Sequence, residues 1–279
     1  SIYYVGYDGP GAGPTTSLYR FSNDGQTVTT VHTWNTNVGI KHTHSCTMIN
    51  GFLYVNIGDS DSQSGIIRWD LQADWSLVGD TPPKDVSALG VSGFIGIGGA
   101  QRYRTIDLVE YNNRLYTFTD ASAIPEAPES ERGIFSCNYD LTDFRRVDSS
   151  IVELGLTVGC YGINCGTHLL MCNLIDAPSG GVSNLHIWST QDGENWGRVM
   201  EFRCQESLTI SKACTAFFYD NGLVYFGLTP AAGRNRQKAT MVLEITDEPF
   251  KGPRADVGLP VIWYDPVSGD DSNTGFTPR

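Results

Sequence analysis

A repeated pattern of short strands and tight turns constrains the fold of this chain more than any other feature of its sequence. The pattern is clearest from Cys46 to Val78, where short apolar runs are closed by turn residues at Asn50-Gly51 and at Asp70 to Asp74. Short runs of this kind, bounded by Asn, Asp and Gly, are typical of antiparallel hairpins. The stretch therefore predicts one meander of four strands, the last of which begins near Trp75.

The same pattern returns along the chain. We predict further copies at Ile106 to Val147, Cys160 to Phe202 and Cys214 to Ile245, with Ile2 to Trp34 as a copy that lacks its first strand. The copies start roughly 50 to 60 residues apart, near the long end of the period of propeller repeats. We therefore expect an all-β fold: a β-propeller of five blades over residues 1–264, each blade a four-stranded antiparallel meander. We expect Val257 to Trp263 to close the ring as the missing innermost strand of the first blade, because closure removes exposed sheet edges.

Composition and charge narrow the classes of function. The chain carries 31 acidic and 19 basic residues, and its formal charge of -12 argues against nucleic-acid binding, where Lys and Arg must replace phosphate counterions. No apolar run reaches the roughly 18 residues that a membrane helix needs. The 7 Cys residues show no disulfide spacing. We interpret them as reduced thiols that act as small core residues, with disulfides as the alternative.

Aspartates close the second strands of the repeat and suggest where ligands could bind. Asp8, Asp59, Asp120 and Asp176 each follow a predicted second strand. Our interpretation is that they cap loop backbone, as Asp does in Asx-turns, and the alternative is a ring of ligand or cation contacts. Asp59 and Asp61 form the best candidate metal site, for Ca²⁺, because hard cations prefer clustered oxygens. Apart from this site we expect no cofactor.

Other candidate residues lie near the predicted first strands and near the longest connection between blades, Thr81 to Arg104. We expect the Gly93 to Gly99 run of this connection to cover a channel mouth. Paired His side chains at the start of the second blade could bind a metal or act as a base, or simply line a wet channel. Exposed aromatic rings could bind sugar, although packing is the alternative role. The candidate ligand-binding residues are Trp34, His42, His44, Tyr103, Asp107 and Tyr161.

The first strands do not provide the groups of a glycosidase. Five-bladed propellers include glycosidases that use paired carboxylates near the axis. Here Asp107 and Glu110 belong to one blade, and the corresponding parts of the other blades have essentially no carboxylate. One blade cannot place an acid and a base on opposite sides of a sugar ring, so we name no catalytic residue and expect no enzymatic activity from this chain.

Two stretches resemble known families. Ser189 to Trp196 resembles the Asp-box of sialidase-type propellers, although Gln191 stands where the family has Asp. This resemblance implies a structural turn with Trp196 in the core. The C-terminal run Val261 to Pro278 resembles the opening of right-handed parallel β-helix domains in bacteriophage tailspikes and related polysaccharide lyases and hydrolases. It implies that residues 265–279 are a linker into a β-helix that lies beyond this chain.

The tailspike resemblance implies a function. We expect a non-catalytic module of a phage tailspike or tail fibre, which either attaches to host-surface glycan or acts as a structural adaptor. The alternative is a glycoside hydrolase of the five-bladed propeller type that acts on surface polysaccharide. The expected partners are bacterial surface polysaccharide and the other domains and subunits of a trimeric spike, with neither nucleic acid nor membrane insertion. The expected location is the virion, assembled in host cytoplasm, which agrees with reduced thiols. Because the chain begins inside a strand, we expect it to be a piece of a longer protein.

Overall fold

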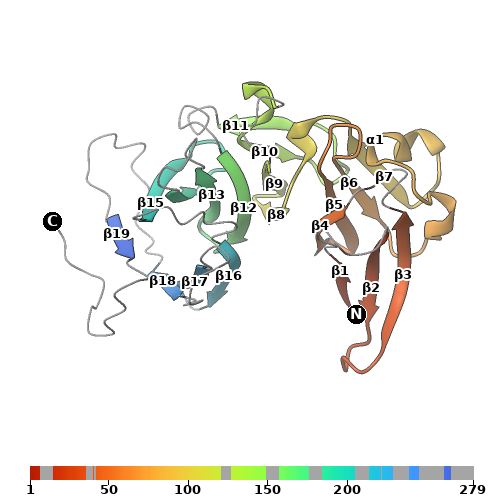
Figure 1. Cartoon of the computed structure of the whole chain (residues 1–279), viewed down its shortest axis with the longest axis horizontal. Helices are drawn as coiled ribbons and strands as arrows, with labels where there is room; N and C mark the ends of the chain where they lie inside the picture. The colour runs from red at the N-terminus through yellow and green to blue at the C-terminus, as the bar shows by residue number, and fades with distance from the viewer. Residues whose placement is uncertain are drawn as a thin grey trace. The chain divides into compact units, whose positions relative to one another are not determined.

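A computed structural model gives the fold of the chain (Figure 1). The structure describes residues 1–6, 15–35, 40, 42–120, 127–148, 157–175, 184–204, 214–220, 222–228, 239–244 and 261–264. Two compact units are present. The first comprises Ser1–Ala121 and Ala127–Arg146, and the second comprises Ser122–Glu126 and Val147–Arg279.

The described residues of the first unit form three antiparallel sheets that follow one another in the chain. The first sheet has three strands: β1 (Ile2–Val5), β2 (Thr15–Phe21) and β3 (Val28–Asn35). The second has four: β4 (His42–Ile49), β5 (Phe52–Gly58), β6 (Gly65–Trp69) and β7 (Phe94–Gly98). The third has four: β8 (Val109–Tyr111), β9 (Arg114–Phe118), β10 (Ile134–Cys137) and β11 (Arg145–Asp148). The short helices lie in connections: η1 (Trp75–Leu77), α1 (Pro83–Val86), η2 (Ser87–Leu89), η3 (Gln101–Tyr103) and η4 (Glu129–Glu131).

The described residues of the second unit form two further sheets. One comprises β12 (Thr157–Asn164), β13 (Leu169–Ile175), β14 (Asn184–Thr190), β15 (Gly197–Cys204) and β19 (Val261–Tyr264), and the other comprises β16 (Cys214–Asp220), β17 (Leu223–Leu228) and β18 (Ala239–Glu244). The chain is therefore all-β, and each predicted copy of the repeat forms a sheet of its own. The predicted closing strand is wrong, because β19 pairs in parallel with β15 rather than with the first sheet. Backbone groups of β19 thus find their partners on the open edge of β15.

The fourth strand of the second sheet differs from the prediction. The residues from Trp75 form the short helix η1, where the carboxylate of Asp74 accepts the Ser76 N–H. The fourth strand is instead β7, within the glycine run that we expected to cover a channel mouth. Glycine is needed there because a Cβ on Gly96 would lie 2.1 Å from the Pro83 carbonyl oxygen. A side chain at this position would push α1 away from the sheet.

One turn geometry recurs in four of the sheets. In three of them the turn joins the last two strands of the repeat, and in the second sheet it follows the third strand, β6. In four sheets an Asp carboxylate accepts the backbone N–H two residues later, and the intervening residue has a positive φ. The four pairs are Asp24-Gly25, Asp70-Leu71, Asp140-Leu141 and Asp192-Gly193. An apolar residue four or five places after the Asp follows the turn. Trp196 is buried at such a position, as the Asp-box resemblance implies.

The second sheet is buried on both faces. On one face Leu53, Val55 and Ile57 of β5 join a cluster with residues of the first sheet, including Leu18 and Trp34. On the other face Tyr54 and Ile66 join a cluster with residues of the third sheet, including Leu115 and Cys137. Alternate residues of one strand point to opposite faces, so β5 has buried side chains throughout its inner part. The three sheets of the first unit therefore pack face to face.

The described thiols behave as core residues. Cys46, Cys137, Cys165 and Cys172 are free, as predicted, and three of them are buried. Burial raises the pKa of the Cys46 thiol to about 11 and those of Cys137 and Cys165 to about 12. These thiols therefore stay protonated at neutral pH.

Candidate functional site

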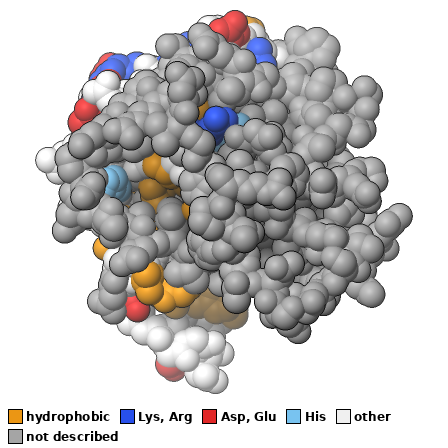
Figure 2. All heavy atoms as spheres, turned by 90° about the vertical axis from the view of Figure 1, so that its left-hand side faces the viewer, with side chains coloured by type: hydrophobic (Ala, Val, Ile, Leu, Met, Phe, Trp, Pro, Cys, Tyr) orange, Lys and Arg blue, Asp and Glu red, His pale blue; other side chains and the backbone are white. Residues whose placement is uncertain are grey.

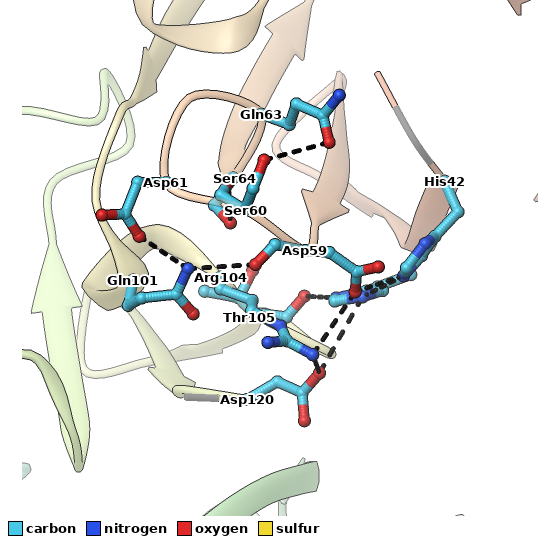
Figure 3. Close-up of polar contacts among 11 residues, drawn as sticks. His42, Asp59, Ser60, Asp61, Gln63, Ser64, Gln101, Arg104, Thr105 and Asp120 are labelled. Atoms are coloured by element: carbon cyan, nitrogen blue, oxygen red, sulfur yellow. Dashed lines mark hydrogen bonds and ion pairs between the residues drawn. The ribbon is translucent and has the colours of Figure 1, made fainter. Parts of the chain in front are cut away.

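A cluster of polar side chains in the first unit lies where the ends of several strands meet. His42 and His44 belong to the start of β4, and Asp59 directly follows β5. Because these strands are antiparallel, His42 pairs with Gly58, which brings Asp59 to the two histidines. Asp120 follows the second strand of the next sheet, and its N–H donates to the Arg104 carbonyl at 2.7 Å. Four segments far apart in the chain thus supply one site (Figure 3).

The two histidines of the site are in direct contact. The distance between their Nε2 atoms is 2.8 Å, so one imidazole donates a hydrogen bond to the other. His44 Nδ1 lies 2.7 Å from the Thr105 carbonyl oxygen, which can only accept. His44 therefore donates through Nδ1, and in its neutral form its Nε2 carries a lone pair. Both rings are almost fully shielded from solvent, with side chains 8% and 6% exposed.

Two carboxylates and one guanidinium surround the histidines. Asp59 Oδ1 lies 3.2 Å from His42 Nε2. Arg104 Nη2 lies between the carboxylates, 3.4 Å from Asp59 Oδ1 and 3.1 Å from Asp120 Oδ2. The side chains of Asp59 and Arg104 are 23% and 22% exposed, so the site is open to solvent on their side. With both histidines neutral, the two carboxylates exceed the one guanidinium by one negative charge.

The predicted pair of metal ligands, Asp59 and Asp61, does not converge on one point. The Asp61 carboxylate accepts from Gln101 Nε2 at 2.7 Å, whereas the Asp59 carboxylate is directed to His42 and Arg104 (Figure 3). The same Gln101 amide also donates to the Asp59 carbonyl at 3.0 Å. A donor therefore takes the place between the two residues that a cation would need. In the structure, the potential metal ligands beside the Asp59 carboxylate are His42 and His44 rather than Asp61.

Local backbone features aim the histidines. The register of β4 against β5 shifts between Thr43 and Ser45, so His44 is the extra residue of a bulge. Bulges re-aim side chains and are frequent beside functional sites. The His44 ring lies against the end of β5, where a Cβ on Gly58 would be 2.3 Å from its Cε1 atom. Only glycine leaves room for the ring in this position.

The remaining sequence candidates lie elsewhere. Trp34 is fully buried among the aromatic rings of His32 and Trp75, so it packs in the core and offers no sugar platform. Tyr103 is half-buried, with its ring centroid 4.7 Å from that of Phe144.

The last two candidates are Asp107 and Tyr161. The Asp107 carboxylate accepts the N–H of the next residue, Leu108, at 2.9 Å. Tyr161 is half-buried at the bulge of β12, in the second unit. Of the six candidate ligand-binding residues, the structure brings His42 and His44 into direct contact.

The sequence contained a signal for one residue of the site that is not among the six candidate ligand-binding residues. Asp120 follows a second strand as Asp59 does, and equivalent positions of neighbouring repeats come close when their sheets pack. Asp8 and Asp176, the other members of that series, lie outside the described residues. Arg104 and Gly58 had no signal, because a single Arg in a loop or a Gly at a strand end occurs in many structural contexts.

Comparison with known proteins does not assign the chain. No protein-family model matches the sequence, and no curated protein matches it significantly. The functional assignment therefore depends on the site itself.

The rest of the described structure adds two findings. Among the described residues no helix is long and apolar enough to cross a membrane. On the face drawn in Figure 2, acidic and basic side chains of described residues lie close together near the upper edge.

Proposed function

We propose that this chain is a five-bladed β-propeller module of a phage tailspike that attaches to bacterial surface glycan without cleaving it. The fold part of the proposal is supported by five consecutive sheets with the same turn in four of them. The face-to-face packing of the second sheet with both neighbours is the arrangement that propeller blades adopt. The resemblance of residues 261–278 to β-helix entry segments supports the tailspike assignment.

The observation that carries the binding role is the partly exposed Asp59–Arg104–Asp120 group. Carboxylate and guanidinium groups held in fixed positions offer several acceptors and donors to the hydroxyls of a sugar. Their rigid mounting on strand ends reduces the entropy lost on binding.

The same group argues against a glycosidase. Such enzymes hold two carboxyl groups about 5–9.5 Å apart with the sugar, or the sugar and a water, between them. Here Arg104 Nη2 occupies the space between Asp59 and Asp120 and contacts both. A scissile bond could enter only if the guanidinium left.

The test is a glycan-array screen of the chain, followed by titration of the best ligand. We expect Asp59→Asn and Arg104→Met to weaken binding at least about tenfold, which corresponds to about 1.4 kcal/mol. Arg20→Met is the matched control, because Arg20 is an exposed arginine of the same unit and should leave binding unchanged.

Two outcomes would overturn the proposal. If no glycan binds, the attachment role is wrong and the structural adaptor remains. If the chain releases sugar from a polysaccharide and Asp120→Asn abolishes that release, the hydrolase alternative replaces the binding role.

A further inference from the structure

The His42, His44 and Asp59 side chains present three metal-binding atoms to one point. His42 Nε2 is 2.8 Å from His44 Nε2 and 3.2 Å from Asp59 Oδ1, and the ligand atoms of all three residues lie within 4.8 Å of one another. Ligands about 2.0–2.2 Å from a tetrahedral Zn²⁺ are separated by about 3.3 Å. Shifts of about 1 Å or less would therefore bring these atoms to coordination distance.

The hydrogen bond of His44 to the backbone is of the kind that orients metal ligands. A histidine that binds a metal usually donates its other ring N–H to a carbonyl or carboxylate, which fixes the tautomer. His44 does this through Nδ1, which donates to the Thr105 carbonyl oxygen at 2.7 Å. Its Nε2 lone pair consequently accepts the His42 Nε2–H in the metal-free chain, so a cation can bind both Nε2 atoms once His42 carries its proton on Nδ1 instead.

Arg104 and Asp120 form the outer contacts of the three ligands. Arg104 Nη2 holds Asp59 Oδ1 at 3.4 Å and so restricts the orientation of that carboxylate. Asp120 Oδ2 contacts Arg104 at 3.1 Å and lies 3.9 Å from His44 Nε2. Asp120 thereby balances the guanidinium charge, while Asp59 supplies the negative charge that favours a divalent ion.

We propose that His42, His44 and Asp59 bind one divalent transition-metal ion of the Zn²⁺ type, with its remaining position toward solvent. Two imidazoles and one carboxylate suit borderline metals such as Zn²⁺, whereas Ca²⁺ prefers oxygen ligands only. The partly exposed Asp59 and Arg104 side chains leave a path for the ion. This proposal does not depend on glycan binding.

The experiment is titration of the purified, metal-free chain with Zn²⁺ by calorimetry, and with Co²⁺ by visible absorption. We expect one equivalent to bind. His44→Gln and Asp59→Asn each remove a metal ligand and should weaken Zn²⁺ binding by more than roughly 100-fold. Arg104→Met removes an outer contact and should weaken it by roughly 10- to 100-fold. His168→Gln is the matched control, because His168 is equally buried but lies in the second unit.

Two readouts keep the test decisive if a variant fails to fold. In the unmodified chain, NMR should show that one equivalent of Zn²⁺ shifts the imidazole signals of His42 and His44 but not those of the other three histidines. The Co²⁺ spectrum should lack the thiolate charge-transfer band that cysteine ligands would give. Absence of stoichiometric binding, unshifted His42 and His44 signals, or a thiolate band would each overturn the proposal.

Discussion

Replacing Gly58 with Ala tests whether the site depends on the close fit of His44 against the end of β5. The new Cβ would lie 2.3 Å from Cε1 and 2.6 Å from Nε2 of His44, whereas carbon atoms at ordinary contact are about 3.5–4.0 Å apart. The ring must move by about 1 Å or more to relieve this overlap. It would then lose its hydrogen bonds to Thr105 and His42.

The expected cost follows from these losses. Overpacking costs about 1–3 kcal/mol, and each lost hydrogen bond costs about 0.5–1.5 kcal/mol. Gly58 does not have a positive φ, so Ala fits its backbone conformation in the folded chain. Ala also restricts the unfolded chain more than Gly does, and this effect offsets about 0.4–1 kcal/mol of the cost. We expect Gly58→Ala to lower the free energy of unfolding by about 3 kcal/mol.

The assay is urea unfolding followed by far-ultraviolet circular dichroism, together with NMR of the histidine rings. Gly6→Ala is the matched control, because its Cβ would meet nothing closer than 3.7 Å. We expect that control to be neutral or more stable by up to about 1 kcal/mol. Equal stability of the two variants, with unchanged His44 signals, would refute the reasoning that Gly58 sets the position of the ring.

Two further predictions concern the repeat. Trp75→Ala should lower the free energy of unfolding by about 3–5 kcal/mol, since Trp75 is 3% exposed among other aromatic rings. Leu77→Ala, in the same short helix but 59% exposed, should cost less than about 0.5 kcal/mol, and similar losses in the two variants would contradict this. Burial acts to raise the pKa of Asp192, but hydrogen bonds from Asn195, Glu194 and Thr190 outweigh it and lower the pKa from 3.8 to about 2. Because the pKa of Asp192 is lower in the folded chain than in the unfolded chain, its ionised carboxylate stabilises the fold above about pH 4, and this stabilisation is lost as the pH falls toward about 2. The contribution of Asp192 to the free energy of unfolding is about 1 kcal/mol after allowance for solvent screening. Asp192→Ala should remove this acid-dependent loss in denaturation measured between these pH values, and an unchanged pH dependence would count against the turn.

Local signals in the sequence predicted the sheets of this protein. The turn at Asn50-Gly51 formed as expected, with both residues at positive φ, which is the geometry of a two-residue hairpin turn. The aspartates of the recurring turn act over two or three residues, so neighbouring sequence is sufficient to specify them. Alternating apolar residues likewise located most strands, because strand periodicity is a local property.

Contacts between segments far apart in the chain decided two features of the fold that the sequence did not predict: the fourth strand of the second sheet and the partner of β19. Whether the fourth strand of the second sheet begins at Trp75 or at Phe94 depends on the packing of α1 against Gly96. The placement of β19 depends on which sheet edge is open, and a strand of four residues does not carry that information.

The candidate site shows the same division. The sequence singled out His42, His44 and Asp59 separately but assigned Asp59 to a different cation, with Asp61. Their convergence requires the antiparallel register of β4 and β5, and the Arg104 contact requires the third sheet to pack against the second. A linear pattern specifies which side chains a strand presents, whereas the packing of sheets determines which of them meet.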